Sequence, residues 1–110
     1  MSWIRFGKIA LVLLAMGTAA GVHADTIWID VRSPLEHSID SIDQDAFIPH
    51  DRIVEDVSKT FPDKDADIRL YCLSGGRAER AKSALEAAGY TNVSNVGGIE
   101  DARRVRGLEQ

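Results

Sequence analysis

The sequence has 110 residues, which is the length of a single domain. Its formal net charge is -4 at pH 7, and it contains one cysteine. The acidic balance argues against nucleic acid or an anionic membrane as a partner, and a lone cysteine excludes an internal disulfide. We therefore expect a small domain that folds without disulfides, and in which the cysteine is present for its chemistry or for core packing.

Residues 1–24 have the pattern of an export signal. A positively charged start and the apolar run IALVLLAM are followed by small residues that end at Ala24. The run is shorter than the roughly 20 apolar residues that a membrane-spanning helix needs. We expect cleavage after Ala24, a mature domain over residues 25–110 in the periplasm, and no stable membrane insertion. An uncleaved membrane anchor is the alternative.

Strand patterns rich in β-branched and aromatic residues alternate with helical patterns along the rest of the chain. In chain order, the sequence predicts a strand at 26–31, a helical turn at 35–39, a loop at 40–45, a short strand at 46–48, a helix opened by Asp51, a turn at 62–65, a strand at 67–72, a helix at 77–88, a strand at 92–96, a turn at 97–98 and a helix at 99–105. This alternation favours an α/β domain with a mostly parallel sheet flanked by helices.

A cysteine stands between the third predicted strand and the helix that follows it, in the segment LYCLSGGRA at 70–78. Gly75 and Gly76 let the connecting loop curl so that backbone N–H groups point inward, and the helix start adds unpaired N–H groups. Arg77 adds a positive charge. Such surroundings lower the pKa of a thiol, and the thiolate is the nucleophilic form. Cys72 is therefore the candidate nucleophile, with a buried core cysteine as the alternative.

The segment CLSGGRA resembles the active-site loop of the rhodanese family, often written C-R-S-G-x-R. Counterparts of other family motifs follow the family order: IDVRSP at 29–34, Ile48-Pro49, Gly89-Tyr90 and NVGGI at 95–99. The whole is most similar to single-domain periplasmic rhodaneses of the phage-shock-protein E type. The resemblance implies a three-layer rhodanese-like domain that needs no metal and no organic cofactor.

The resemblance also implies a thiosulfate sulfurtransferase, which we expect to be a monomer. The Cys72 thiolate would attack the outer sulfur of thiosulfate, sulfite would leave, and the Cys72 persulfide would pass its sulfur to cyanide or to a small thiol. The expected substrate-binding residues are those of the loop: Leu73, Ser74, Gly75, Gly76 and Arg77.

Two other functions stay open at this point. A phosphatase or arsenate reductase would also use a cysteine nucleophile, but the spacing from Cys72 to Arg77 is C-x4-R, one residue shorter than the C-x5-R loop of related phosphatases. A non-catalytic sulfur carrier or binding module, loaded by a partner protein, would need the same loop as the enzyme.

Several charged residues are interpreted as structural support. Asp30 is expected to accept backbone N–H groups at the end of its strand, and Arg32 to pair with Glu36, four residues on. His37 and His50 have no metal-ligand spacing and are expected at the surface.

The sequence differs from the rhodanese motifs at several positions, and several arginines lie near its C-terminal end. The family's G-H-I-x-G-A is replaced by DSIDQD at 40–45, so its histidine and second glycine are missing around Ser41 and Gln44. Leu73 and Gly76 make the loop less positive than is usual. Trp28 is expected in the core, and the arginines at 103, 104 and 106 on a solvated helix face, with a docking patch for an acidic partner as the alternative.

Overall fold

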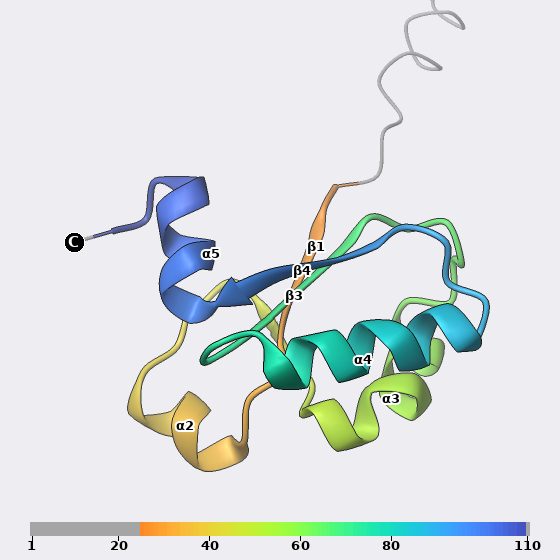
Figure 1. Cartoon of the computed structure of the whole chain (residues 1–110), viewed down its shortest axis with the longest axis horizontal. Helices are drawn as coiled ribbons and strands as arrows, with labels where there is room; N and C mark the ends of the chain where they lie inside the picture. The colour runs from red at the N-terminus through yellow and green to blue at the C-terminus, as the bar shows by residue number, and fades with distance from the viewer. Residues whose placement is uncertain (1–24, 110) are drawn as a thin grey trace, which may run out of the picture.

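The computed structural model describes residues 25–109, so the predicted signal peptide lies outside the described residues. In chain order, the elements are β1 (Ile27–Asp30), α2 (Pro34–Ile39), β2 (Ala46–Phe47), η1 (His50–Arg52), α3 (Ile53–Thr60), β3 (Ile68–Cys72), α4 (Gly76–Ala87), β4 (Val93–Gly98) and α5 (Ile99–Arg106) (Figure 1). No helix among residues 25–109 has the length and apolar character needed to cross a membrane.

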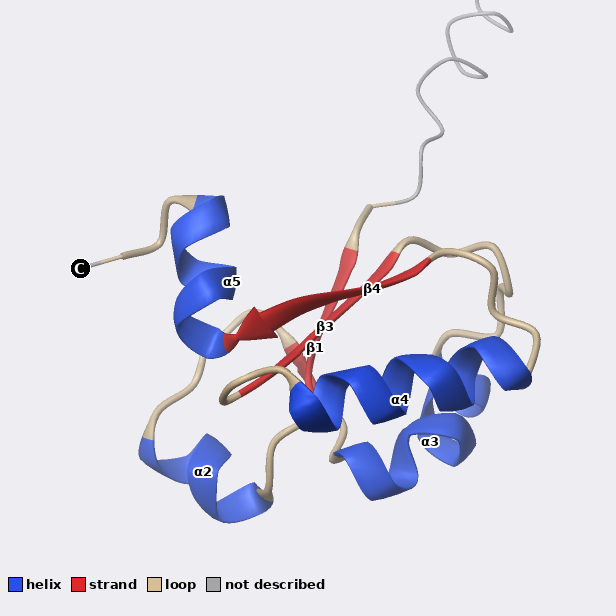
Figure 2. Ribbon diagram, in the orientation of Figure 1, coloured by secondary structure: helices blue, strands red, loops and turns tan. Residues whose placement is uncertain are grey.

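The four strands form one sheet in the order β2-β1-β3-β4, and every neighbouring pair is parallel (Figure 2). The prediction of a parallel α/β sheet is therefore confirmed. Strand β3 is central, and four of its five residues are buried. Because parallel strands end at the same edge of a sheet, the last residues of β1, β3 and β4 lie close together: Asp30 is opposite Tyr71, and Cys72 is opposite Gly98.

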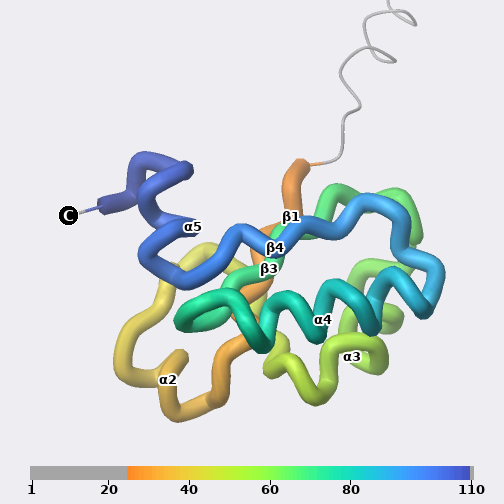
Figure 3. The backbone as a smooth tube through the Cα atoms, viewed as in Figure 1, coloured from red at the N-terminus to blue at the C-terminus, as the bar shows by residue number. Residues whose placement is uncertain are grey.

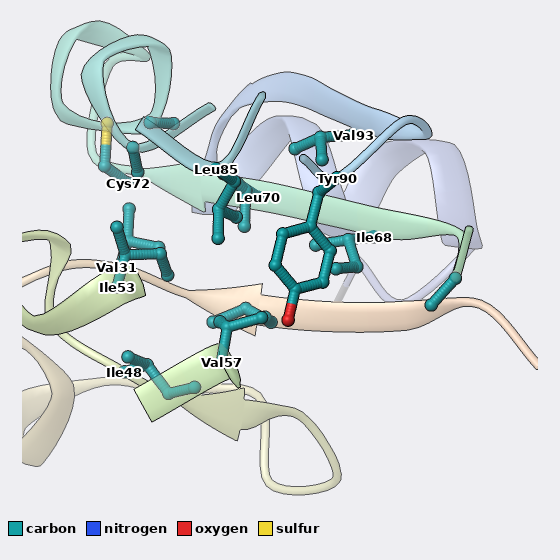
Figure 4. Close-up of a cluster of buried hydrophobic side chains, with 14 residues drawn as sticks. Val31, Ile48, Ile53, Val57, Ile68, Leu70, Cys72, Leu85, Tyr90 and Val93 are labelled. Carbon is teal, nitrogen blue, oxygen red and sulfur yellow. The ribbon is translucent and has the colours of Figure 1, made fainter. Parts of the chain in front are cut away.

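Helices cover both faces of the sheet, which gives the expected three layers. Helices α3 and α4 lie side by side on one face and enclose the larger core (Figures 3 and 4). The small side chains of Ala78 and Ala81 let α4 approach the sheet closely. On the other face, α5 and the loop before β2 enclose a smaller core made of Ile42, Tyr71, Ile99 and Ala102, with the half-buried Trp28 packed against it, as expected for that tryptophan.

Three boundaries differ from the prediction. Pro34 is the first residue of α2, a position that proline suits because its missing N–H has no partner there. The helix expected from Asp51 begins as the short 3-10 helix η1 and becomes α3 at Ile53. Gly97-Gly98 was expected to form a turn, but both residues belong to β4, which shifts register so that Gly98 comes opposite Cys72. The loop that follows Cys72 thus packs directly on the end of β4.

Candidate active site

The Cys72 sulfur lies inside the loop that connects β3 to α4. Cys72 is the last residue of β3 and is only 1% exposed, and its side chain points into the turn of the loop (Figure 4). The N–H of Gly75 donates a hydrogen bond of 2.9 Å to its sulfur. Gly75 precedes α4 with a φ of 104°, a left-handed conformation that glycine adopts without strain. The glycine therefore allows the loop to fold back over the sulfur.

The surroundings favour the thiolate form of Cys72. Burial raises the pKa of this thiol, but hydrogen bonds from the backbone N–H groups of Ala78, Gly75, Ser74 and Arg77 outweigh it, so the pKa lies below its usual value. The expectation named the loop from Leu73 to Arg77 and missed Ala78, which belongs to the first turn of α4. The helix N-terminus was the available signal, because its first N–H groups have no partner within the helix.

Leu73 and Gly76 are not among the residues whose N–H groups lower the pKa of Cys72. Gly76 is the first residue of α4. The side chain of Leu73 is 60% exposed, and its carbonyl group packs against Gly98. Leu73 therefore borders the loop on its outer side, while Ser74, Gly75 and Arg77 turn their N–H groups toward the sulfur.

The Arg77 side chain is held by Glu36. Its two terminal nitrogens donate to the two carboxylate oxygens of Glu36, at 2.6 and 2.9 Å. Glu36 also accepts from the backbone N–H of Ser33, which caps α2. The guanidinium and the backbone of Ser33 hold the pKa of the Glu36 carboxyl well below its usual range. The positive charge expected at the loop end is thus matched by a carboxylate from α2.

The predicted ion pair between Arg32 and Glu36 is wrong. The two nitrogens Nε and Nη2 of Arg32 donate instead to Asp30, at 2.9 and 2.8 Å. Side chains four residues apart are neighbours only within a helix. Arg32 lies before Ser33, the residue that caps α2, and so lies outside the helix. The Arg32 guanidinium therefore reaches back to the end of β1, and Glu36 is free to bind Arg77.

Asp30 is the centre of a buried polar cluster. Its carboxylate accepts from the Arg32 backbone N–H at 2.9 Å, as expected, and lies 3.0 Å from Nδ1 of His37. Burial raises the pKa of the Asp30 carboxyl, but the hydrogen bonds from Arg32 and His37 lower it to below its usual value. His37 is not the isolated surface residue that was expected, because it also stacks on Phe47 with ring centroids 4.1 Å apart. The cluster fixes the chain between β1 and α2.

Strand β4 supports the loop from the other side. The amide nitrogen of Asn95 donates to the carbonyl oxygen of Gly75 at 3.0 Å, and its amide oxygen accepts from the N–H of Gly97 at 2.9 Å. A side chain at Gly98 would overlap the carbonyl of Leu73, whose carbon would lie 2.9 Å from the added Cβ. Asn95 begins the NVGGI motif, but no role was predicted for it from the sequence.

Comparison with known proteins agrees with this geometry. The family model described as "Rhodanese-like domain" matches residues 13–104. The chain belongs to the rhodanese-like domain family. It is 34% identical over 94 residues to "Thiosulfate sulfurtransferase PspE" of Escherichia coli (strain K12), which covers 86% of this chain and 90% of that protein. This rhodanese-like domain is thus related to a sulfurtransferase over most of both chains.

Solved structures show the same fold. A structure described as "rhodanese with anions from E. coli" is 34% identical, with a TM-score of 0.66, and the match covers 70% of this chain and 91% of that chain. The rhodanese-like domain of an Anabaena protein is 25% identical, with a TM-score of 0.67 and 76% and 94% coverage. The chain is also 35% identical to "tRNA uridine(34) hydroxylase" of Sodalis glossinidius (strain morsitans) over 86 residues, but it spans only 24% of that protein's length.

The basic end of the rhodanese-like domain is not a free cationic patch. Arg103 pairs with Asp40 at 2.7 Å, Arg104 with Asp101, and Arg106 with Asp45 at 2.7 Å. These carboxylates neutralise the three arginines that were expected on a solvated helix face or a docking patch. The ion pairs of Arg103 and Arg106 instead fasten α5 to the loop before β2.

Proposed function

We propose that this rhodanese-like domain is a thiosulfate sulfurtransferase that carries the transferred sulfur as a persulfide on Cys72. One observation carries the proposal: the Cys72 sulfur faces backbone N–H groups of the loop and of the first turn of α4, which lower the pKa of its thiol. Such N–H groups stabilise a thiolate, and equally the negative outer sulfur of a persulfide.

The reaction is a double displacement in two balanced steps. In the first, the Cys72 thiolate attacks the outer sulfur of thiosulfate; the new S–S bond forms as the old one breaks, and sulfite leaves with the electron pair. In the second, a cyanide ion or a thiolate attacks the outer sulfur of the persulfide, and the S–S bond to Cys72 breaks. Cys72 returns as the thiolate, so neither step needs an oxidant, a reductant or a metal.

The loop dimensions support sulfur rather than phosphate as the transferred group. Four residues separate Cys72 from Arg77, and Cys72 is only 1% exposed within the loop. A recessed nucleophile of this kind is approached end-on by a slim reagent such as thiosulfate or cyanide. A phosphate ester, with four oxygens around phosphorus, needs a wider ring of donors.

A sulfur carrier loaded by a partner protein is the second candidate, and the pairing of Arg77 favours it. A free arginine would attract a dianionic donor from solution, whereas Arg77 is already bound by Glu36. Free thiosulfate would then be captured weakly, and a partner would deliver the sulfur directly.

Turnover separates the two candidates. Purified protein is mixed with thiosulfate and cyanide, thiocyanate is followed, and Cys72→Ser is the control. We expect turnover that the variant lacks, and after thiosulfate alone a mass increase of about 32 Da, one sulfur atom, on the wild type. A mass increase without turnover would favour the carrier, and the absence of both would contradict the enzyme.

We further propose that the protein is exported to the periplasm after cleavage behind Ala24, and that it acts as a monomer. The export pattern of residues 1–24 supports the first proposal. Fractionation of expressing cells, followed by N-terminal sequencing, tests it, since cleavage leaves Asp25 as the first residue. Sedimentation of the purified protein tests the second.

A further inference from the structure

An apolar cavity borders the active-site loop and has no part in the reaction described so far. It has a volume of about 260 Å³ and lies between α2, the loop and the start of α5. Its apolar walls are Ile39, Leu73 and Ile99. Ile39 is 76% exposed and Leu73 60% exposed, although large apolar side chains are ordinarily buried. Their exposure next to one cavity indicates a surface that something apolar covers.

The cavity is tied to both ends of the active-site loop. Leu73 directly follows Cys72, and Glu36, which also lines the cavity, holds Arg77 at the end of the loop. Cys72 itself does not line the cavity, so a molecule there would contact Leu73, the residue directly after the nucleophile. Thiosulfate and cyanide are small ions without an apolar part, so neither of them accounts for these walls.

The charge around the cavity disfavours an anionic occupant. Three carboxylates line it, those of Glu36, Asp40 and Glu100. Arg77 pairs with the first, and Arg103 is shared by the other two. The arginine that lines the cavity, Arg32, is matched by Asp30, so among these paired groups one negative charge is in excess.

The charge of the domain has the same sign. All 17 acidic residues but only 11 of the 13 basic residues lie after residue 24, because Arg5 and Lys8 precede it, which leaves a net charge of -6. An uncharged molecule is not repelled by this negative charge, whereas a molecule that carries a carboxylate or a sulfonate is repelled.

We propose that the cavity binds the apolar body of the sulfur acceptor, and that this acceptor is a small thiol without a negatively charged group. The proposal rests on the proposed function. The acceptor loses its thiol proton to solvent, and its thiolate attacks the outer sulfur of the Cys72 persulfide. The S–S bond to Cys72 then breaks, so the acceptor leaves as a persulfide and Cys72 returns as a thiolate.

The volume limits the size of the acceptor. Pockets for drug-sized ligands measure roughly 300–1,000 Å³, and this cavity lies just below that range. It therefore suits one ring or a short alkyl chain and not a bulky cofactor. Ile39 and Leu73 are the residues that would determine this preference, since they form its exposed walls.

The first experiment needs no turnover, because Cys72 is the only cysteine. Three alkylating reagents with the same slim iodomethyl end are compared by intact mass: iodoacetamide, N-benzyl-iodoacetamide and its 4-carboxybenzyl analogue. Each rate is divided by the rate with free N-acetylcysteine. We expect the benzyl reagent to react about 5- to 10-fold faster than iodoacetamide on this scale, since burying one methylene changes binding about fourfold. The added carboxylate should remove most of that gain.

Substitutions locate the effect. Ile39→Ser and Leu73→Ser should each lower the advantage of the benzyl reagent about threefold or more. Leu35→Ser and Val105→Ser are matched controls, because Leu35 is 70% and Val105 64% exposed and neither lines the cavity. Equal rates for the three reagents, or an Ile39→Ser effect no larger than that of Leu35→Ser, would overturn the proposal.

A second experiment measures the acceptor itself. After loading with thiosulfate, turnover with benzyl mercaptan is compared with turnover with 4-(mercaptomethyl)benzoate, and cyanide is the reference acceptor. We expect the uncharged thiol to be preferred about 5-fold or more, and Ile39→Ser to remove this preference. Loss of turnover with every acceptor would contradict the proposed function alone, whereas turnover without a preference between the two thiols would contradict the cavity proposal.

Discussion

The guanidinium of Arg77 and the carboxylate of Glu36 form a two-point ion pair, although 41 residues separate them in the chain. The pair joins the end of the active-site loop to the first turn of α2. It orients Arg77 beside Cys72, and at the same time it cancels the positive charge that an anionic sulfur donor would seek. The loop therefore relies on its backbone N–H groups to stabilise negative sulfur.

Removal of the Glu36 charge is expected to improve the capture of thiosulfate. In Glu36→Gln, the side chain keeps its shape and can still cap α2, because glutamine also serves at this position of a capping box. The freed charge of Arg77 should lower the KM for thiosulfate about three- to tenfold at low salt, and the gain should shrink as ionic strength rises. Steady-state kinetics at two salt concentrations measure this. An unchanged or higher KM would show that Arg77 needs Glu36 for its orientation.

The same ion pair makes stability depend on pH. Arg77 and the Ser33 backbone lower the pKa of Glu36 in the folded state. The ionised Glu36 therefore contributes fully to the free energy of unfolding above its unfolded pKa of about 4.3, and this contribution is lost as the pH falls toward the folded pKa. At pH 7, Glu36→Gln should be less stable than the wild type by about 1 kcal/mol. Urea unfolding at pH 7 and at pH 3 measures the difference in the free energy of unfolding between the wild type and Glu36→Gln, and this difference should be smaller at pH 3. A gap that is equal at both pH values would contradict this prediction.

The thiol of Cys72 should ionise below its ordinary pKa. Burial opposes ionisation, but the N–H groups of Ala78, Gly75, Ser74 and Arg77 outweigh it. We expect the rate of alkylation by iodoacetamide to reach half of its plateau value at a pH below the reference pKa of about 8.5 for a free cysteine. A pH series read by intact mass gives the apparent pKa directly. N-acetylcysteine under the same conditions is the control, and an apparent pKa at or above that of the control would refute the prediction.

Asn95 is expected to position the loop without touching the sulfur. Its amide links Gly75 to Gly97, at 3.0 and 2.9 Å, and also donates to Glu79 at 3.0 Å, so Asn95→Ala removes all three contacts. The N–H of Gly75 should then point less well at the sulfur, which raises the pKa of Cys72 and lowers the rate of alkylation at pH 7. We also expect a loss of stability of about 1 kcal/mol.

A matched control for this prediction is Asn92→Ala. Asn92 lies just before β4 and is exposed. The pH profile of alkylation separates the two variants, since it should shift for Asn95→Ala and stay unchanged for Asn92→Ala. Equal profiles would mean that Asn95 only stabilises the fold.

Local patterns in the sequence were sufficient to predict the parallel α/β fold and the Cys72 loop. The nucleophile, the two glycines and the helix start are consecutive residues, so their chemistry can be inferred without the tertiary structure. The partners of the loop could not be predicted in this way, because Glu36 and Asn95 reach it across the fold. The pairing of Arg32 was predicted wrongly for a related reason: helical spacing was applied to a residue that lies before the helix begins.

Gly98 should tolerate no side chain, because the active-site loop lies against it. Its φ of -101° and ψ of 174° are open to any residue, so the obstacle is steric: an added Cβ would overlap the carbonyl of Leu73. We expect Gly98→Ala to cost about 2–3 kcal/mol of stability and to slow alkylation of Cys72, since the loop must move away. Gly76→Ala is the matched substitution, with no atom within 4 Å of its added Cβ. That variant should be as stable as the wild type or about 0.5 kcal/mol more stable. Urea unfolding of both variants measures the contrast, and similar stabilities for the two would show that β4 does not hold the loop.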